Sequence, residues 1–144
     1  MDDSANQASP TVIRPSVTVN PVIHNPVEDS TSIYYIHPGD IGICLSREQF
    51  IGENYLSWSK TIMINLQTKN KIAFVDGLIT VPSVTTTDPV SLIALQRNNS
   101  LVLSWLMMAI APDIRNSLLY ITVAYEAWEE LRSRYVKCDG PWVF

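Results

Sequence analysis

Histidine and cysteine side chains are the groups in this chain best suited to acid–base, nucleophilic or metal chemistry. The chain has two histidines, His24 and His37, and two cysteines, Cys44 and Cys138, which are far apart in the sequence. Neither pair has the spacing of a metal site or a redox motif. His24 lies in a proline-rich stretch that offers no fixed geometry for a base. We therefore expect a structural His37 and two reduced thiols, with a disulfide as the alternative.

Motifs for catalysis or nucleotide binding are absent. The sequence has no Gly-x-Ser-x-Gly, His-Glu-x-x-His or Walker-type loop, and no Asp-Ser-Gly or Asp-Thr-Gly triplet. The carboxylates after residue 51 fall at expected helix starts or on a polar helix face, where the helix dipole and hydration account for them. The sequence therefore predicts no catalytic residue, no cofactor and no metal ion.

Large aromatic side chains could instead form a binding site by stacking on nucleic-acid bases. Tyr55 and Trp58 are three residues apart and share a face of an expected helix, and Trp105 and Trp128 recur further on. Each ring shares its helical stripe with aliphatic residues, and Lys60 is their one basic neighbour. We therefore expect these rings to face the core of their own domain.

The charge of the chain is unevenly distributed. Residues 1–50 hold six acidic and two basic residues, while residues 51–144 hold eight of each. The zero net charge of residues 51–144 argues against strong non-specific binding to a phosphate backbone, because such binding requires clustered Lys and Arg. The longest apolar stretch, residues 101–111, is far shorter than the ~20 residues that cross a bilayer, so we expect no membrane partner.

Proline and glycine divide the chain into three parts. Residues 1–32 contain four prolines, and their valines fit neither a helix face nor a long strand, which predicts a disordered leader, with a weak extended segment around "TVIRPSVTV" as the alternative. Residues 33–137 are predicted to form one helical domain, beginning with an extended arm that reaches Phe50. Residues 138–144 are predicted to be a truncated C-terminal tail.

The domain is predicted to be all-α, with about four helices. Apolar spacing and capping signals predict helices from Asn54 to about 70, from Asp88 to about 110, over 112–121 and over 122–136. There is no βαβ alternation. In the first helix, Leu56, Met63 and Ile64 widen the apolar stripe, so we expect this helix to be covered on more than one side. In the last, Thr122 is the expected N-cap, and Glu130 and Arg134 form an i,i+4 pair.

Four segments, in the same order along the chain, resemble the N-terminal Gag domain of copia-type LTR retrotransposons, a family abundant in plant genomes. They are "YYIHPGD", "GENYLSWSKTIMINLQTKNKIAFVDG", "NNSLVLSWLMMAIAPDI" and "AYEAWEELRSRY", which together cover about residues 33–141. The residues of the family motif and expected core are Tyr35, Gly52, Asn54, Tyr55, Trp58, Phe74, Asp76, Gly77, Asn99, Trp105, Trp128 and Leu131. Lys71 also belongs to the shared pattern, and we interpret it as one of the cations that favour a helix C-terminus.

The resemblance implies a capsid-like helical domain that acts by protein–protein assembly. The family often has Trp and Cys where this chain has Leu95 and Asn98, and a family member would continue beyond "DGPWVF". The sequence is therefore expected to be a truncated or domesticated fragment of a Gag polyprotein, without the zinc knuckle and the enzymes that normally lie downstream. We expect it to associate with itself or with related Gag proteins, in the cytoplasm or alternatively in the nucleus.

Two other functions remain open from the residues alone. A nucleic-acid-binding module would use the basic residues of the last helix, Arg132, Arg134 and Lys137, as weak RNA contacts. A small-molecule enzyme would need a deep polar pocket with convergent titratable groups. We expect weak or no direct nucleic-acid binding and no small-molecule substrate.

Overall fold

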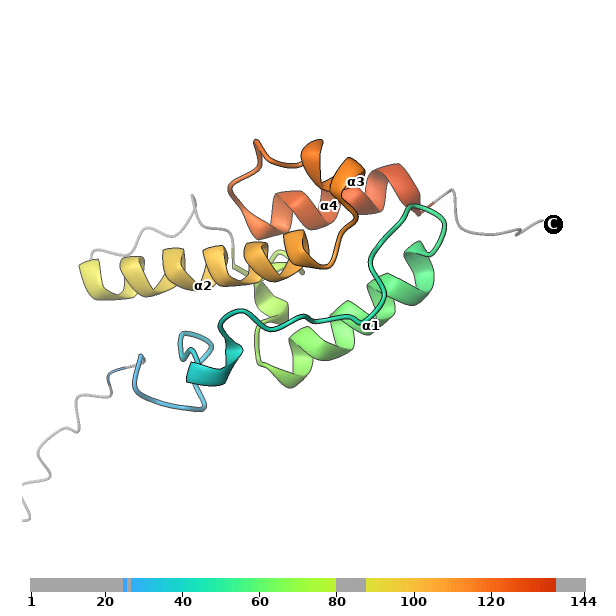
Figure 1. Ribbon diagram of the computed structural model, residues 1–144. Coiled ribbons are helices and arrows are strands. Elements are labelled where there is room, and N and C mark those ends of the chain that lie inside the picture. The colour runs from blue at the N-terminus through green and yellow to red at the C-terminus, as the bar shows by residue number, and fades with distance from the viewer. Residues whose placement is uncertain (1–24, 26, 80–87, 137–144) are drawn as a thin grey trace, which may run out of the picture.

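Helices joined by loops make up the described part of the chain. The computed structural model describes residues 25, 27–79 and 88–136 (Figure 1). Its helices are η1 (Pro38–Asp40), α1 (Tyr55–Thr68), η2 (Ile72–Phe74), α2 (Pro89–Met108), α3 (Pro112–Asn116) and α4 (Ala124–Tyr135). Among the described residues, the only β pairing is an isolated parallel bridge between Phe50 and Ile110. The predicted all-α class is confirmed.

The boundaries of α1 are set by two asparagines. Asn54 occupies the N-cap position but makes no capping bond. Instead, its Oδ1 accepts from the Ile51 N–H and its Nδ2 donates to the Gln49 carbonyl, each at 3.0 Å, which braces the loop before the helix. At the other end Asn70 has a φ of 58°, and the N–H of Lys71 donates to the Leu66 carbonyl at 2.8 Å. This is a Schellman ending with Asn in the left-handed position.

Helix α2 begins at the predicted cap and ends slightly early. Asp88 Oδ1 accepts from the Val90 N–H at 3.1 Å, and Pro89 occupies the first turn, where no N–H is needed. The helix stops at Met108 because the next residues pair with the arm. Phe50 donates its N–H to the Ala109 carbonyl at 2.8 Å and accepts from the Ala111 N–H at 2.9 Å.

Two predictions about the last helices are wrong in detail. The predicted helix over 112–121 is helical only to Asn116, and residues 117–120 continue as turns. Helix α4 starts at Ala124 rather than 122, and Thr122 is not its cap: the N-cap position is Val123, which makes no side-chain bond. The cap is supplied from elsewhere in the fold, as described below. The predicted i,i+4 ion pair in α4 is present, with Arg134 Nη2 2.6 Å from Glu130 Oε1.

The core contains a chain of stacked and edge-on aromatic rings. Phe50, Trp58 and Trp128 are at most 6% exposed, with ring centroids 4.8 Å apart for Phe50–Trp58 and 5.8 Å for Trp58–Trp128. Tyr55 and Tyr135 meet Phe50 edge-on. Rings from the arm, α1 and α4 thus hold three separate segments together, each burial contributing about 2–3 kcal/mol.

The arm before α1 lies between α1 and α2 (Figure 1) and buries part of its apolar surface. Leu45 and Phe50 are buried, whereas Ile41 remains 67% exposed. Asn25 and residues 27–32, the end of the predicted leader, form hydrogen-bonded turns. Residues 1–24 and 138–144 lie outside the described residues, so the disordered leader, the truncated tail and the domain limits stay predictions.

Candidate assembly site

Polar side chains of the helices hold the arm by bonding to its backbone carbonyls. Each donor is the amide, indole or ammonium group of a side chain. The bonds run from Asn65 to Leu45, from Asn70 to Thr31, from Lys71 to Ile33 and Tyr35, from Asn98 to Tyr34, and from Trp105 to Asp40. Because these donors come from α1, α2 and the segment between α1 and η2, the arm is fixed from two sides.

Lys71 is the residue whose role the sequence interpretation missed. It was interpreted as one of the cations that favour a helix C-terminus, but its side chain is fully buried and its Nζ donates to the carbonyls of Ile33 and Tyr35, the latter at 2.7 Å. Burial lowers the pKa of Lys71 from 10.5 to about 8, and the carboxylate of Asp40 partly opposes this by raising it. The available signal was its place in the family pattern.

Asn99 links α2 to the start of α4. Its Oδ1 accepts from the Ala124 N–H at 2.9 Å and its Nδ2 donates to the Thr122 carbonyl at 2.8 Å. The side chain is 6% exposed. An asparagine in the middle of one helix therefore satisfies a free N–H at the first turn of another, which is the capping role predicted for Thr122.

The other family-motif residues also serve the fold. Gly52 and Gly77 have φ of 99° and 90°, and Asp76 Oδ1 accepts from the Leu78 N–H at 2.9 Å, which makes a tight turn after η2. The remaining members lie in or beside the core, with Tyr35 half-buried and Tyr55, Phe74, Trp58, Trp105, Trp128 and Leu131 buried.

The described residues offer little catalytic chemistry. His37 Nδ1 accepts from the Gly39 N–H at 3.1 Å, which caps η1 and accounts for this histidine. Cys44 is a free, exposed thiol, whereas His24 and Cys138 lie outside the described residues. Over residues 25, 27–79 and 88–136, no three His, Cys, Asp or Glu side chains gather where they could hold a metal ion, and no helix is long and apolar enough to span a membrane.

The basic residues of α4 are engaged with neighbouring carboxylates. Arg132 lies 3.6 Å from Glu129, and Arg134 pairs with Glu130 and also donates to Ser117 Oγ at 2.9 Å. Lys137 lies outside the described residues. Paired cations have less charge to offer a phosphate, so this face gives the RNA-contact prediction no added support, and it stays a prediction.

The outer face of α1 carries apolar side chains that the described residues of the chain leave exposed. Leu56 is 58% exposed and Ile64 52% exposed, and Met63 lies between them along the same face, with Lys60 as the only charge. Their spacing of seven and eight residues places them in one row. Among the described residues, the expectation that α1 is covered on more than one side is therefore wrong. We call Leu56, Lys60, Met63 and Ile64 the α1 outer face.

These features describe a small helical domain of a structural type. Its polar side chains fix the domain's own backbone, and part of its apolar helix surface stays exposed. Residues 37–83 match the family described as "Gag-polypeptide of LTR copia-type". The matched residues include the arm from His37, α1 and η2, and their similarity to copia-type Gag confirms the resemblance over this segment. Neither a curated protein nor a solved structure gives a significant match. The resemblance beyond residue 83 stays a prediction.

Proposed function

We propose that this chain is a non-enzymatic structural module related to copia-type Gag, which acts by self-association through the α1 outer face. Association with related Gag proteins uses the same face, and the cytoplasm is its proposed location. The observation that carries the proposal is the exposure of Leu56 and Ile64 in one row of a helix that lies within the matched Gag segment. An apolar row on a helix is stabilised by packing against another apolar surface.

A second copy is the partner that fits this row best. In an antiparallel pair of α1 helices in which Leu56 of one copy meets Ile64 of the other, Met63 lies beside Ile64 near each end of the contact, and the Lys60 side chains of the two copies meet at its centre. The single charge, Lys60, has a long side chain that can keep its ammonium group in water while its methylene groups cover the row. Such a contact repeats the same residues on both copies, as a two-fold interface requires.

The contact is small, which sets its strength. Fourteen helical residues extend over about 21 Å, and one helix face of this length buries less than the ~800 Å² per partner of a standard interface. We therefore expect weak association that depends on concentration. Weak contacts of this kind suit an assembly in which many copies bind together, because their effects multiply.

Sedimentation equilibrium of the full chain over a range of concentrations tests the proposal. The wild type is expected to show a reversible monomer–dimer equilibrium, and the variants Leu56→Asp and Ile64→Asp are expected to weaken it at least about 10-fold, because each places a carboxylate in the apolar contact. Both side chains are more than half exposed, so the fold should be unaffected.

Leu119→Asp is the matched control, since Leu119 is a leucine with 65% exposure that lies outside α1. This variant is expected to associate like the wild type. A wild type that stays monomeric at every concentration, alone and when mixed with a copia-type Gag protein, would contradict the proposal. Equal weakening by Leu119→Asp would show that the α1 outer face is not the contact.

A further inference from the structure

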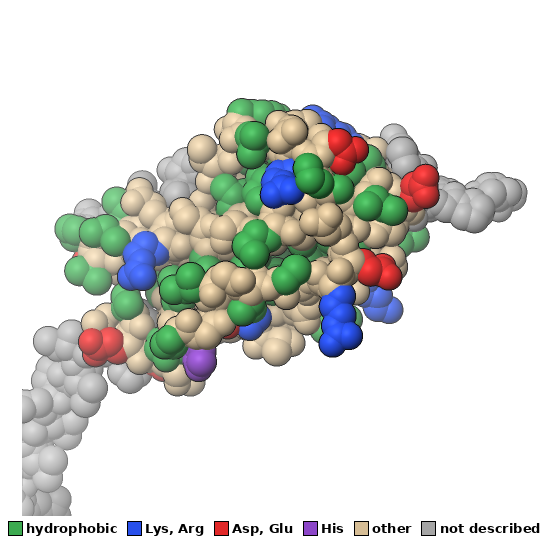
Figure 2. All heavy atoms as spheres, viewed as in Figure 1, with side chains coloured by type: hydrophobic (Ala, Val, Ile, Leu, Met, Phe, Trp, Pro, Cys, Tyr) green, Lys and Arg blue, Asp and Glu red, His purple; other side chains and the backbone are tan. Residues whose placement is uncertain are grey.

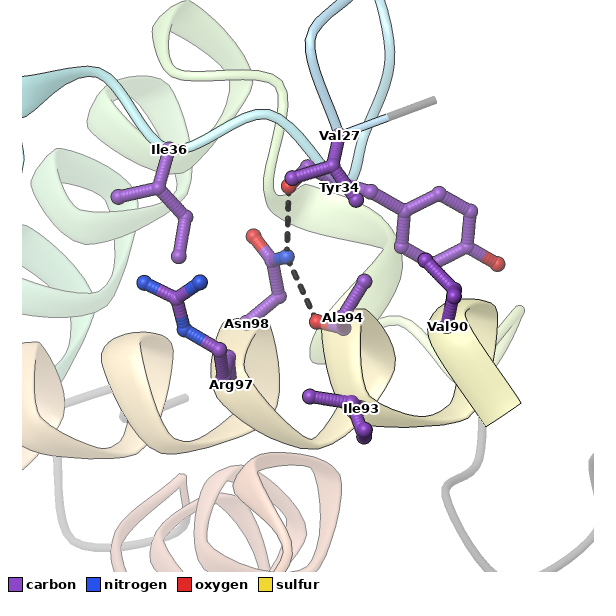
Figure 3. A pocket seen from close by; sticks show the side chains of 8 residues that line it. All are labelled: Val27, Tyr34, Ile36, Val90, Ile93, Ala94, Arg97 and Asn98. Carbon is purple, nitrogen blue, oxygen red and sulfur yellow. Dashed lines mark hydrogen bonds between the residues drawn. The ribbon is translucent and has the colours of Figure 1, made fainter. Parts of the chain in front are cut away.

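An open apolar groove runs between the arm and α2, and none of the described residues that line it belongs to the α1 outer face. One pocket of about 260 Å³ is lined by Tyr34 and Ile36 of the arm and by Val90, Ile93 and Arg97 of α2. A second pocket shares Ile36 and Arg97 and extends along α2 to Ser104. Apolar side chains gather along this boundary in Figure 2, and Figure 3 shows the first pocket from close by. We call these two pockets together the arm–α2 groove.

Arg97 is the only charged side chain among the described residues that line the groove. It is exposed, its guanidinium lies beside Ile36 in Figure 3, and it makes no hydrogen bond or ion pair with the described residues. An unpaired cation beside apolar walls is complementary to an occupant that brings an aromatic or aliphatic side chain together with a carboxylate. No carboxylate of the described residues lines the groove, so contact between the grooves of two copies would leave Arg97 unpaired on both.

Tyr120 and Glu126 present this combination at the start of α4. Both line a hollow between the turn that precedes α4 and the helix itself. Tyr120 is 71% exposed, and Glu126 is exposed and makes no hydrogen bond or ion pair with the described residues. The other carboxylates of the hollow, Glu129 and Glu130, are paired with arginines of α4. We call Tyr120 and Glu126 the Tyr120–Glu126 surface.

The groove and the Tyr120–Glu126 surface lie apart on one copy. In Figure 1 the arm around η1 and helix α4 lie on opposite sides of α2, so a contact between the two surfaces joins different copies. We propose that the Tyr120–Glu126 surface of one copy docks in the arm–α2 groove of a second copy. The ring of Tyr120 then lies against Tyr34 and Ile93, and the carboxylate of Glu126 pairs with Arg97.

Each part of this contact has its own role. Burial of the exposed Tyr120 ring supplies most of the stabilisation, and aromatic rings favour the edge-on or offset contact that Tyr34 offers. The ion pair fixes the orientation and disfavours the groove-to-groove arrangement. Because the contact buries one ring and one ion pair, which is less than a helix face, we expect it at higher protein concentrations than the α1 dimer.

The contact is head-to-tail, since it joins different surfaces of the two copies. Each pair of copies therefore keeps one free groove and one free Tyr120–Glu126 surface, to which further copies can add. The proposed α1 contact is two-fold and stops at two copies. The head-to-tail contact thus adds a direction of growth to the proposed function without depending on it.

Sedimentation velocity of the full chain carrying Leu56→Asp measures this contact separately, because that variant weakens the α1 contact. Oligomers larger than a dimer are expected as the concentration rises. In this background Arg97→Glu and Glu126→Arg are each expected to weaken association at least about 10-fold, because each brings two like charges together. The two changes in one chain restore opposite charges and are expected to recover association. A Leu56→Asp chain that stays monomeric at every concentration, or a double variant that does not recover, would overturn the proposal.

Arg47→Glu combined with Glu126→Arg is the matched control, since Arg47 is exposed and lies outside the groove. This pair of changes gives the same net charge as the pair that includes Arg97→Glu, but it is expected not to recover association. Recovery would show that net charge rather than the proposed contact determines association, and would overturn the proposal. Leu119 is next to Tyr120, yet Leu119→Asp remains a valid control for the α1 contact, because that contact is tested at concentrations below those that fill the groove.

Mixing two variants tests the head-to-tail arrangement, again with Leu56→Asp in both chains. Ile93→Asp places a carboxylate in the groove wall, and Tyr120→Asp removes the ring. The replaced side chains are 56% and 71% exposed, so the fold should be unaffected. Each variant is expected to stay monomeric alone, whereas an equimolar mixture is expected to form a heterodimer that does not grow further. Absence of the heterodimer would overturn this proposal but not the α1 contact, which the chain without Leu56→Asp tests at lower concentration.

Discussion

Asn99 of α2 takes the place of a capping residue for α4: its Oδ1 accepts the N–H of Ala124 at 2.9 Å, although 25 residues separate them. The same side chain donates to the Thr122 carbonyl, so it fixes both sides of the turn into α4. Two helices are therefore joined by a buried polar contact. This arrangement requires one acceptor and one donor on the same short side chain, which Asn supplies.

Replacing Asn99 by Ala is expected to lower the free energy of unfolding by about 2–3 kcal/mol, because it removes a cap and leaves a buried N–H and a carbonyl without partners. Thr122→Ala is the matched comparison, since the side chain of Thr122 is exposed and makes no capping bond. We expect that variant to change stability by less than about 0.5 kcal/mol. Urea denaturation of both measures the difference. A larger loss for Thr122→Ala than for Asn99→Ala would show that α4 is capped from its own sequence.

Local signals predicted the helix starts that depend on neighbouring residues. Asp88 followed by Pro89 begins α2 as expected, and Glu130 and Arg134 pair as expected, because each of these requires only residues within one turn. The all-α class followed from apolar spacing for the same reason. These features are determined before any long-range contact forms.

Contacts between distant segments could not be predicted in this way. The roles of Asn99 and Lys71 depend on which backbone groups the fold brings beside them, namely the start of α4 and the arm. The exposure of Leu56 was missed because an apolar stripe on a helix indicates burial without saying whether the covering surface belongs to the same chain. Position in the family pattern singled out Asn99 and Lys71, but it did not reveal their roles.

Stability is expected to depend on pH through Lys71. In the folded chain burial lowers its pKa to about 8, while in the unfolded chain the pKa returns to 10.5. Between these values the unfolded state binds the additional proton, so the contribution of Lys71 to stability rises as the pH increases from about 8 to about 10.5. The expected gain is of the order of 3 kcal/mol. A neutral amine still has two N–H donors for the carbonyls of Ile33 and Tyr35, so the arm stays bound.

The measurement compares the wild type with Lys71→Met by urea denaturation between pH 7 and pH 10.5. Taking the difference between the two proteins removes the contribution of every group that titrates alike in both. The difference is expected to be constant below about pH 7.5 and then to move in favour of the wild type. A difference that stays constant across the range, or that moves in favour of Lys71→Met, would show that the ammonium group is not buried in the way the structure describes.

The turn after η2 provides a test of close packing at a glycine. Gly77 has a φ of 90°, and a Cβ at this position would lie 3.3 Å from the ring of Tyr125. Gly77→Ala is therefore expected to incur both the strain of a left-handed alanine, about 1–2 kcal/mol, and the displacement of the ring. Gly42 isolates the first effect, since its φ is 80° and a Cβ there would meet no atom within 4 Å. Thermal denaturation should show a larger decrease in Tm for Gly77→Ala than for Gly42→Ala. Equal decreases would mean that Tyr125 moves aside without cost, and that the start of α4 is not packed against this turn.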